Sequence, residues 1–133
     1  MADTPKMLLL GDEPIAHDLL SSYLSAWFEV SGKPCGHAEA LAIARAAEVD
    51  VVLIDADLTD VDPAEFVMGI VLVCAAPVVT ISAVAGPGSA VATALFAAGA
   101  RVVSHKPTGR LTLDLHGAFG EALVATSRQI AAA

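Results

Sequence analysis

Two aspartates, spaced one residue apart, follow a run of branched apolar residues near the middle of the chain. The run extends from Val51 to Ile54, and the acids are Asp55 and Asp57. An unalternated apolar run of this kind predicts a strand buried on both faces, as in a parallel sheet covered by helices. Open α/β sheets bind ligands outside the carboxyl ends of their strands, which is where both acids would lie. A lone acid there serves as readily as a turn former, so the question is which other groups reach that edge.

Three further polar groups close shorter apolar runs, namely Asp12, Ser82 and Lys106. If all the runs are parallel strands, these groups project from the same edge as Asp55 and Asp57. Crowded carboxylates repel by about 4 kcal/mol per close pair at an effective dielectric of roughly 20, and a divalent cation would neutralise them. Carboxylate and carbonyl oxygens suit Mg²⁺ that retains several waters. Since Lys106 can pair with an anion on Asp55 and Ser82 can donate to a phosphoryl oxygen, the set predicts a site that carries a phosphoryl group on a carboxylate.

Strands and helices are expected to alternate along the whole chain, with an element pair roughly every 20 to 25 residues. We expect strands at 7–10, 51–55, 78–82 and 102–103, with a weak one in 29–36, and helices at 15–28, 38–47, 64–76, 89–98 and 114–131. Asp12 is a plausible cap for the first helix, and Asp62 with Pro63 should begin the third. Residues 69–73 are β-branched and fit a strand as well as a helix. The alternation predicts one domain, 1–133, with a doubly wound parallel sheet of five strands and five helices.

The bulk composition excludes several classes of protein. The net charge of −8 leaves little to neutralise phosphates, so we expect no nucleic-acid partner. Cys35 and Cys74 lie far apart without metal-ligand spacing and are expected to be buried, unpaired side chains. The N-terminus shows no secretion signal, and the longest apolar run, 66–76, is too short to cross a bilayer. We therefore expect a cytoplasmic protein with no membrane partner.

The acid, serine and lysine motifs, in this order and spacing, resemble the receiver domain of two-component response regulators over nearly the whole chain. The tail segment 106–115 is similar to the corresponding segment in the receiver half of chemotaxis protein-glutamate methylesterases, and 77–82 resembles that subfamily too. The resemblance implies a flavodoxin-like fold with strand order 2-1-3-4-5. It also implies a cis peptide between Lys106 and Pro107, which only an X-Pro bond makes accessible at low cost.

The resemblance assigns a role to each residue of the site. It places the phosphoacceptor on Asp55, the switch hydroxyl on Ser82 and the phosphate-pairing lysine on Lys106. It makes Asp12, Asp55 and the backbone carbonyl of Asp57 the ligands of Mg²⁺. The implied partners are a histidine kinase that donates the phosphoryl group and an effector domain or downstream protein. The chain would then be a regulatory phosphoacceptor and not itself an enzyme, since it contains no methylesterase catalytic domain.

Three departures from the family pattern keep a second interpretation open. Gly11 replaces the first acid of the usual pair, the loop 58–63 is unusually acidic, and Val103 stands where a switch aromatic is usual. These changes also fit a degenerate receiver that acts as a phosphorylation-independent interaction or dimerisation module. The segments 67–76 and 90–98 lack a polar stripe, which favours a face covered by a partner, either a second copy or an effector domain.

A third interpretation is enzymatic. The spacing of Asp55, Asp57 and Thr59 matches the opening motif of haloacid-dehalogenase-type phosphatases, which also form an aspartyl phosphate with Mg²⁺. Ser82 and Lys106 would supply the later motifs of that family. Its final acidic motif should follow the lysine, however, whereas the Gly-Asp pair here precedes every other motif, and the chain is short for the usual cap. The phosphatase interpretation is therefore the least favoured.

Overall fold

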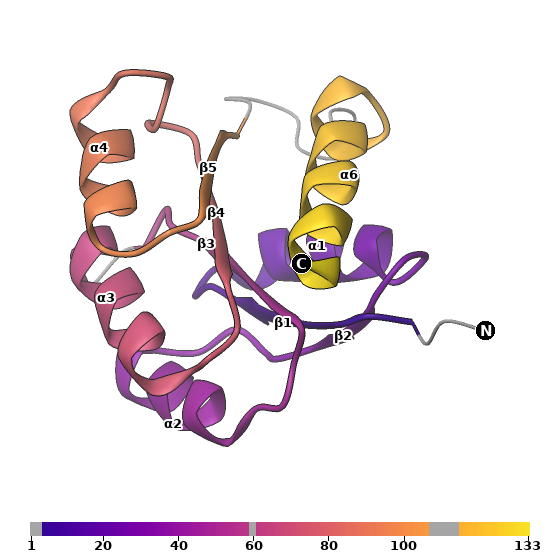
Figure 1. Cartoon of the computed structure of the whole chain (residues 1–133), viewed down its shortest axis with the longest axis horizontal. Coiled ribbons are helices and arrows are strands. Elements are labelled where there is room, and N and C mark those ends of the chain that lie inside the picture. The colour runs from indigo at the N-terminus through magenta and orange to yellow at the C-terminus, as the bar shows by residue number, and fades with distance from the viewer. Residues whose placement is uncertain (1–3, 59–60, 107–114) are drawn as a thin grey trace.

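The computed structural model describes residues 4–58, 61–106 and 115–133, within which strands and helices alternate. The strands are β1 (Lys6–Leu10), β2 (Glu29–Ser31), β3 (Val51–Asp55), β4 (Val78–Ser82) and β5 (Val102–His105). The helices are α1 (Pro14–Leu24), α2 (His37–Ala46), α3 (Pro63–Val73), α4 (Ala90–Ala97) and α6 (Ala118–Ala132). The strands form one parallel sheet in the order β2-β1-β3-β4-β5, which confirms the predicted fold (Figure 1).

The sheet is sandwiched between two helical layers, with α2, α3 and α4 on one face and α1 and α6 on the other (Figure 1). Every residue of β3 is buried, and successive side chains point to opposite faces. Val52 and Ile54 pack with α2, α3 and α4, whereas Val51 and Leu53 pack with α1 and α6. The unalternated apolar run is thus the central strand of a two-sided core.

The helix starts follow their capping residues. Asp62 caps α3 by accepting from the backbone N–H of Glu65 at 3.1 Å, and Pro63 is the first helical residue, as predicted. The prediction that Asp12 caps α1 is wrong. Glu13 is the cap, because its carboxylate accepts from the N–H groups of both Ile15 and Ala16, at 3.2 and 2.6 Å. Asp12 therefore precedes the cap, between the end of β1 and the start of α1.

Some element bounds differ from those predicted. The ambiguous stretch 69–73 is helical, and α3 runs without a break to Val73. Helix α1 ends at Leu24 instead of Phe28, and the N–H of Glu29 then donates to the Pro5 carbonyl at 2.9 Å, so the chain passes directly into β2. Strand β5 continues to His105, two residues further than predicted.

No helix within the described ranges is long and apolar enough to cross a membrane.

Candidate functional site

The register of the sheet brings three of the predicted residues to one edge. Asp55 is paired with Ile81 across β3 and β4, so Ser82 lies one residue beyond that pair. The ladder then continues past the strand ends, because the backbone N–H of Lys106 donates to the carbonyl of Ser82 at 2.8 Å. Asp55, Ser82 and Lys106 consequently meet at the carboxyl edge, although the first and last are 51 positions apart in the sequence.

Lys106 forms a two-pronged ion pair with Asp55. Its Nζ donates to Oδ1 at 2.9 Å and to Oδ2 at 3.1 Å. Asp55 is only 6% exposed, and the lysine side chain 13%. Burying two charges costs several kcal/mol unless geometry and further hydrogen bonds compensate, so an ion pair this deep in the edge favours a functional role over a purely stabilising one.

The side chain of Asp57 lies at the centre of the same cluster, a position that the sequence did not predict. Its Oδ2 is 2.7 Å from Nζ of Lys106, and its Oδ1 accepts from Oγ of Ser82 at 2.8 Å. The backbone N–H of Ala83 also donates to this carboxylate, at 3.0 Å to Oδ2 and 3.3 Å to Oδ1. The N–H of Asp57 donates to Oδ1 of Asp55 at 3.2 Å in an Asx-type turn. This turn directly follows β3 and holds the backbone of Asp57 against the side chain of Asp55.

The two carboxyls have opposite electrostatic environments. Burial raises the pKa of Asp55, and this effect outweighs the attraction of Lys106. Burial alone would also raise the pKa of Asp57, but hydrogen bonds from Lys106, Ala83 and Ser82 together outweigh it, so the pKa of Asp57 is lowered. Burial would lower the pKa of Lys106, but the hydrogen bond to Asp57 and the charge of Asp55 raise it. The raised pKa of Lys106 keeps the lysine an ammonium between the two acids.

The predicted Mg²⁺ ligands follow neighbouring strands. Asp12 lies after β1, whose last residue, Leu10, pairs with Ile54 of β3. A Cβ added to Gly11 would lie 3.3 Å from the Cβ of Asp55, so the β1 loop passes directly beside this carboxyl. No group of three or more His, Cys, Asp or Glu side chains in the described ranges is arranged to hold a metal. Mg²⁺ often uses only one or two carboxylates plus waters, so Asp12, Asp55 and the Asp57 carbonyl fit that ion, and their ligation stays a prediction.

Of two further features that the resemblance implies, the structure describes the switch position but not the cis peptide. Val103 pairs with Thr80 in the sheet and packs against the core on the side of α2, α3 and α4, so an aliphatic side chain fills the place expected for a switch aromatic. The peptide between Lys106 and Pro107, predicted to be cis, lies outside the described residues. Thr59 and the tail residues 107–114 also lie outside them.

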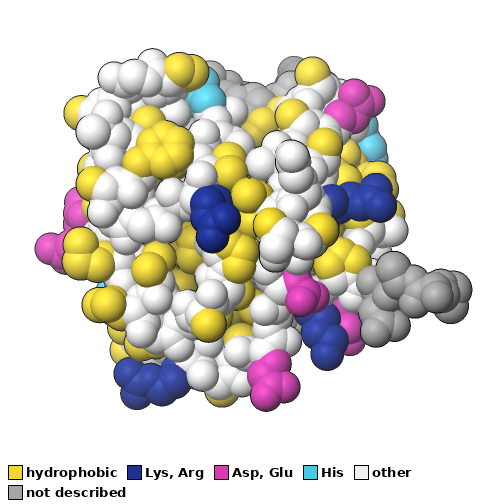
Figure 2. All heavy atoms as spheres, viewed as in Figure 1, with side chains coloured by type: hydrophobic (Ala, Val, Ile, Leu, Met, Phe, Trp, Pro, Cys, Tyr) yellow, Lys and Arg dark blue, Asp and Glu magenta, His cyan; other side chains and the backbone are white. Residues whose placement is uncertain are grey.

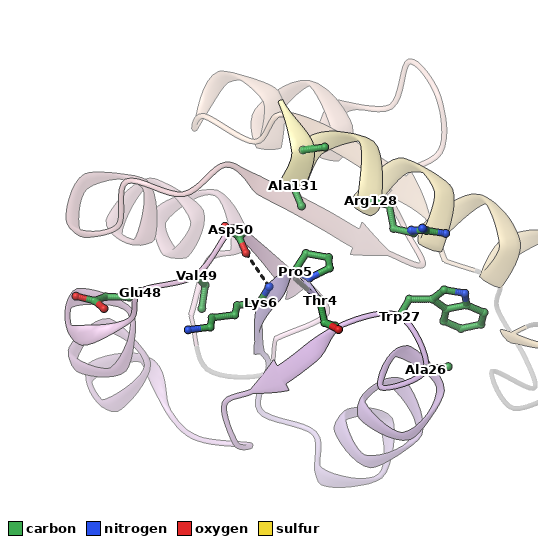
Figure 3. A pocket seen from close by; sticks show the side chains of 11 residues that line it. Thr4, Pro5, Lys6, Ala26, Trp27, Glu48, Val49, Asp50, Arg128 and Ala131 are labelled. Carbon is green, nitrogen blue, oxygen red and sulfur yellow. Dashed lines mark hydrogen bonds between the residues drawn. The ribbon is translucent and has the colours of Figure 1, made fainter. Parts of the chain in front are cut away.

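A groove of about 980 Å³ lies at the opposite, amino edge of the sheet (Figure 3). It is lined by residues from the start of β1, the α1–β2 loop, the α2–β3 loop and the end of α6, among them Lys6, Trp27, Asp50 and Arg128. The N–H of Lys6 donates to Oδ2 of Asp50 there, at 2.8 Å on an exposed surface. Because these polar groups are not assembled into a cluster, we place the functional site at the carboxyl edge despite the size of the groove.

Known structures share the fold of this chain. The receiver domain of Thermotoga maritima CheB is 20% identical with a TM-score of 0.84, and 98% of each chain is covered. Vibrio cholerae CheY4 is 23% identical with a TM-score of 0.74, covering 96% of this chain and 99% of that one.

The receiver domain of Pseudomonas aeruginosa sensor histidine kinase PA1611, described with magnesium in its active-site cleft, is 18% identical with a TM-score of 0.67 and covers 96% of this chain and 98% of that one. No protein-family model and no curated protein matches the sequence. The chain thus has the receiver-domain fold, which confirms the predicted resemblance at the level of structure.

Proposed function

We propose that the chain is the receiver domain of a two-component response regulator and accepts a phosphoryl group on Asp55 from a histidine kinase. The observation that carries the proposal is the Lys106 ammonium bound to both oxygens of a buried carboxylate at the carboxyl edge. The hydroxyl of Ser82 belongs to the same hydrogen-bonded cluster. A fold shared with receiver domains supports the same role. A cytoplasmic location and a regulatory, non-enzymatic role are part of this proposal.

The transfer itself is a displacement at phosphorus. An oxygen of Asp55 forms the new P–O bond while the P–N bond of the kinase phosphohistidine breaks, and its electron pair returns to the imidazole. Lys106 neutralises charge on the transferring oxygens, and Ser82 donates to one of them. When bound, Mg²⁺ supplies further charge neutralisation, held by Asp12, Asp55 and the backbone carbonyl of Asp57. The magnesium described in the PA1611 receiver domain supports this assignment.

Intact-mass measurement tests this proposal. The chain is incubated with Mg²⁺ and acetyl phosphate, and we expect one phosphate adduct. Asp55→Asn should abolish the adduct, whereas Glu48→Gln, an exposed acid beside the amino-edge groove, should retain it. An adduct that persists in Asp55→Asn, or none in any form of the protein, would overturn the proposal. Hydrolysis of a generic phosphomonoester would instead favour the phosphatase alternative.

The output of the switch is proposed to differ from that of receivers with a switch aromatic. Val103 is aliphatic, partly buried and packed against the core, so we propose that the signal passes through the β4–α4 loop that follows Ser82. A decisive shift between two arrangements requires about 5 kcal/mol of differential contact. The likeness to the CheB receiver domain suggests a chemotaxis methylesterase catalytic domain as the regulated partner.

The alternative of a phosphorylation-independent interaction module is favoured by an exposed apolar surface over α3 and α4 (Figure 2). Met68 is 51% exposed, Leu72 79% and Phe96 52%. Such a surface suits self-association or an effector domain. Light scattering across a concentration series would show a dimer that Leu72→Ser weakens, and a strictly monomeric chain would contradict self-association. If Mg²⁺ and acetyl phosphate also leave the protein unmodified, the interaction module becomes the better description.

A further inference from the structure

The Asp57 carboxylate is bound in the way that a small anion would be bound. Three donors from two segments of the chain converge on its two oxygens: the Ser82 hydroxyl, the neighbouring Ala83 N–H and the Lys106 ammonium, all between 2.7 and 3.3 Å. One is a full positive charge, and a hydrogen bond from a charged donor is roughly twice as strong as a neutral one. The Asp57 carboxylate therefore occupies an anion-binding position at this edge of the sheet.

These donors are the ones that a phosphoryl group on Asp55 would need. A serine hydroxyl and a backbone amide each carry a single hydrogen, so each has one hydrogen to donate. In this structure the hydrogens of Ser82 and Ala83 are directed at Asp57. A phosphoryl oxygen can take them only when the Asp57 carboxylate withdraws. The two anions consequently compete for one set of donors.

Asp57 has a route by which to withdraw. It lies beyond the end of β3, and its side chain is 27% exposed, against 9% for that of Asp55. The carboxylate can therefore leave by rotation of its own side chain, without breaking the strand. Its backbone carbonyl, the expected metal ligand, belongs to a different part of the residue.

We propose that Asp57 is an internal competitor that occupies the phosphoryl-binding position of the unmodified domain and slows phosphorylation of Asp55. This regulation rests on the proposed function of Asp55 as phosphoacceptor. Asp57 is thus a positioning residue for the Ser82 and Lys106 donors, and its departure is part of the switch. In the unmodified domain, Ser82 and Lys106 are already arranged around an anion, the Asp57 carboxylate.

Kinetics of labelling test the competition. The rate of adduct formation with Mg²⁺ and acetyl phosphate is compared in the wild type, Asp57→Ala, Asp57→Asn and Glu48→Gln. Removing the carboxylate should accelerate labelling by about tenfold or more, as expected for the loss of a competing charge-assisted hydrogen bond. Asp57→Asn keeps one acceptor oxygen and should fall between the wild type and Asp57→Ala. Glu48→Gln removes the same charge at a distance, so it measures the general electrostatic effect and should change the rate little.

The resonance of the Ala83 backbone amide gives a second readout that needs no phosphoryl donor. In the wild type its proton should lie downfield because it is bonded to a carboxylate, and Asp57→Ala should move it upfield while Glu48→Gln leaves it in place. An unchanged Ala83 resonance, or equal labelling rates in the wild type and both Asp57 variants, would overturn the competition while leaving Asp55 as acceptor. Absence of labelling in every form, with the Ala83 shift intact, would instead overturn the phosphoacceptor role and leave Asp57 as the site's internal ligand.

Discussion

The two edges of the sheet differ in how they use charged residues. At the carboxyl edge, Asp55, Asp57, Ser82 and Lys106 form one compact, largely buried hydrogen-bonded cluster. At the amino edge, Lys6, Asp50 and Arg128 line a wide groove. The groove has a volume of about 980 Å³, yet the cluster has the converging donors and acceptors that chemistry requires. Convergence of several donors on one carboxylate is thus a better guide to a site here than the volume of a groove.

The largest effect is expected from removing the cation of the carboxyl edge. Lys106→Met leaves two acids facing each other without their ammonium, and should lower the free energy of unfolding by about 3 kcal/mol. Urea denaturation in the presence of a chelator measures the loss, and added Mg²⁺ should recover part of it. The matched control is Lys33→Met, which removes a 2.8 Å ion pair with Glu39 on the open surface. A loss in Lys33→Met as large as that in Lys106→Met would erase the contrast between buried and exposed charge.

Adding charge to the same edge sharpens the comparison. Gly11→Asp restores an acid beside Asp55, and should cost about 1 kcal/mol of stability without metal because like charges repel. The same variant should bind Mg²⁺ several-fold more tightly, since the added carboxylate attracts the ion. Unfolding with and without Mg²⁺ measures both effects. Gly11→Ala controls for the tight space, where a Cβ would meet the Cβ of Asp55 at 3.3 Å. The same response in Ala and Asp would show that charge plays no part.

The pH dependence of stability should isolate the second carboxyl. Hydrogen bonding lowers the folded pKa of Asp57, so its ionised form adds stability above its unfolded pKa of about 3.9, and this stability is lost as pH falls through the folded value. The free energy of unfolding is therefore compared between the wild type and Asp57→Asn, with chelator present. The wild-type advantage should be constant above about pH 5 and shrink on further acidification. Burial raises the pKa of Asp55 in both proteins, so this contribution is shared, whereas the charge of Asp57, which also raises the pKa of Asp55, is present in the wild type alone. An advantage that grows with acid would reverse the assignment.

The smallest effect is expected at the amino edge. Asp50→Asn weakens the hydrogen bond from the N–H of Lys6, which lies on an exposed surface. It should cost less than about 1 kcal/mol and leave the rate of phosphate labelling unchanged. A large fall in labelling for this variant would show that the two edges are coupled.

Most of the fold was predictable because a strand buried on both faces requires a continuous run of apolar residues in the sequence. The apolar runs ending near Leu10, Asp55 and Ser82 mark strands covered on both faces, and parallel register then brings their ends together. The stretch 69–73 was ambiguous from sequence because β-branched residues fit both a strand and a buried helix. Packing of α3 against the sheet decides in favour of the helix.

The site was predictable only in part. Residue type and position placed Asp55, Ser82 and Lys106 at one edge, and the structure brings them together. The orientation of the Asp57 side chain was missed, because it depends on an Asx-type turn and on donors distant in the chain. The available signal was a second acid two residues after the first, beside a serine and a lysine. The cap of α1 was assigned to Asp12 instead of Glu13 because two adjacent acids precede the helix, and the sequence alone does not show which one accepts from its first N–H groups.

The backbone contacts that follow β4 have a mechanical consequence. The N–H of Val84 is bonded to the Ser82 hydroxyl at 3.2 Å, and the Ser82 carbonyl receives the N–H of Lys106. The Val84 side chain projects from this short chain of bonds and is 65% exposed. A protein that contacted Val84 would therefore act on a residue bonded directly to the Ser82 hydroxyl, and Ser82 in turn is bonded to the backbone of Lys106. A displacement of Val84 would reach the Asp57 carboxylate through two hydrogen bonds, from Val84 to the Ser82 hydroxyl and from that hydroxyl to Asp57.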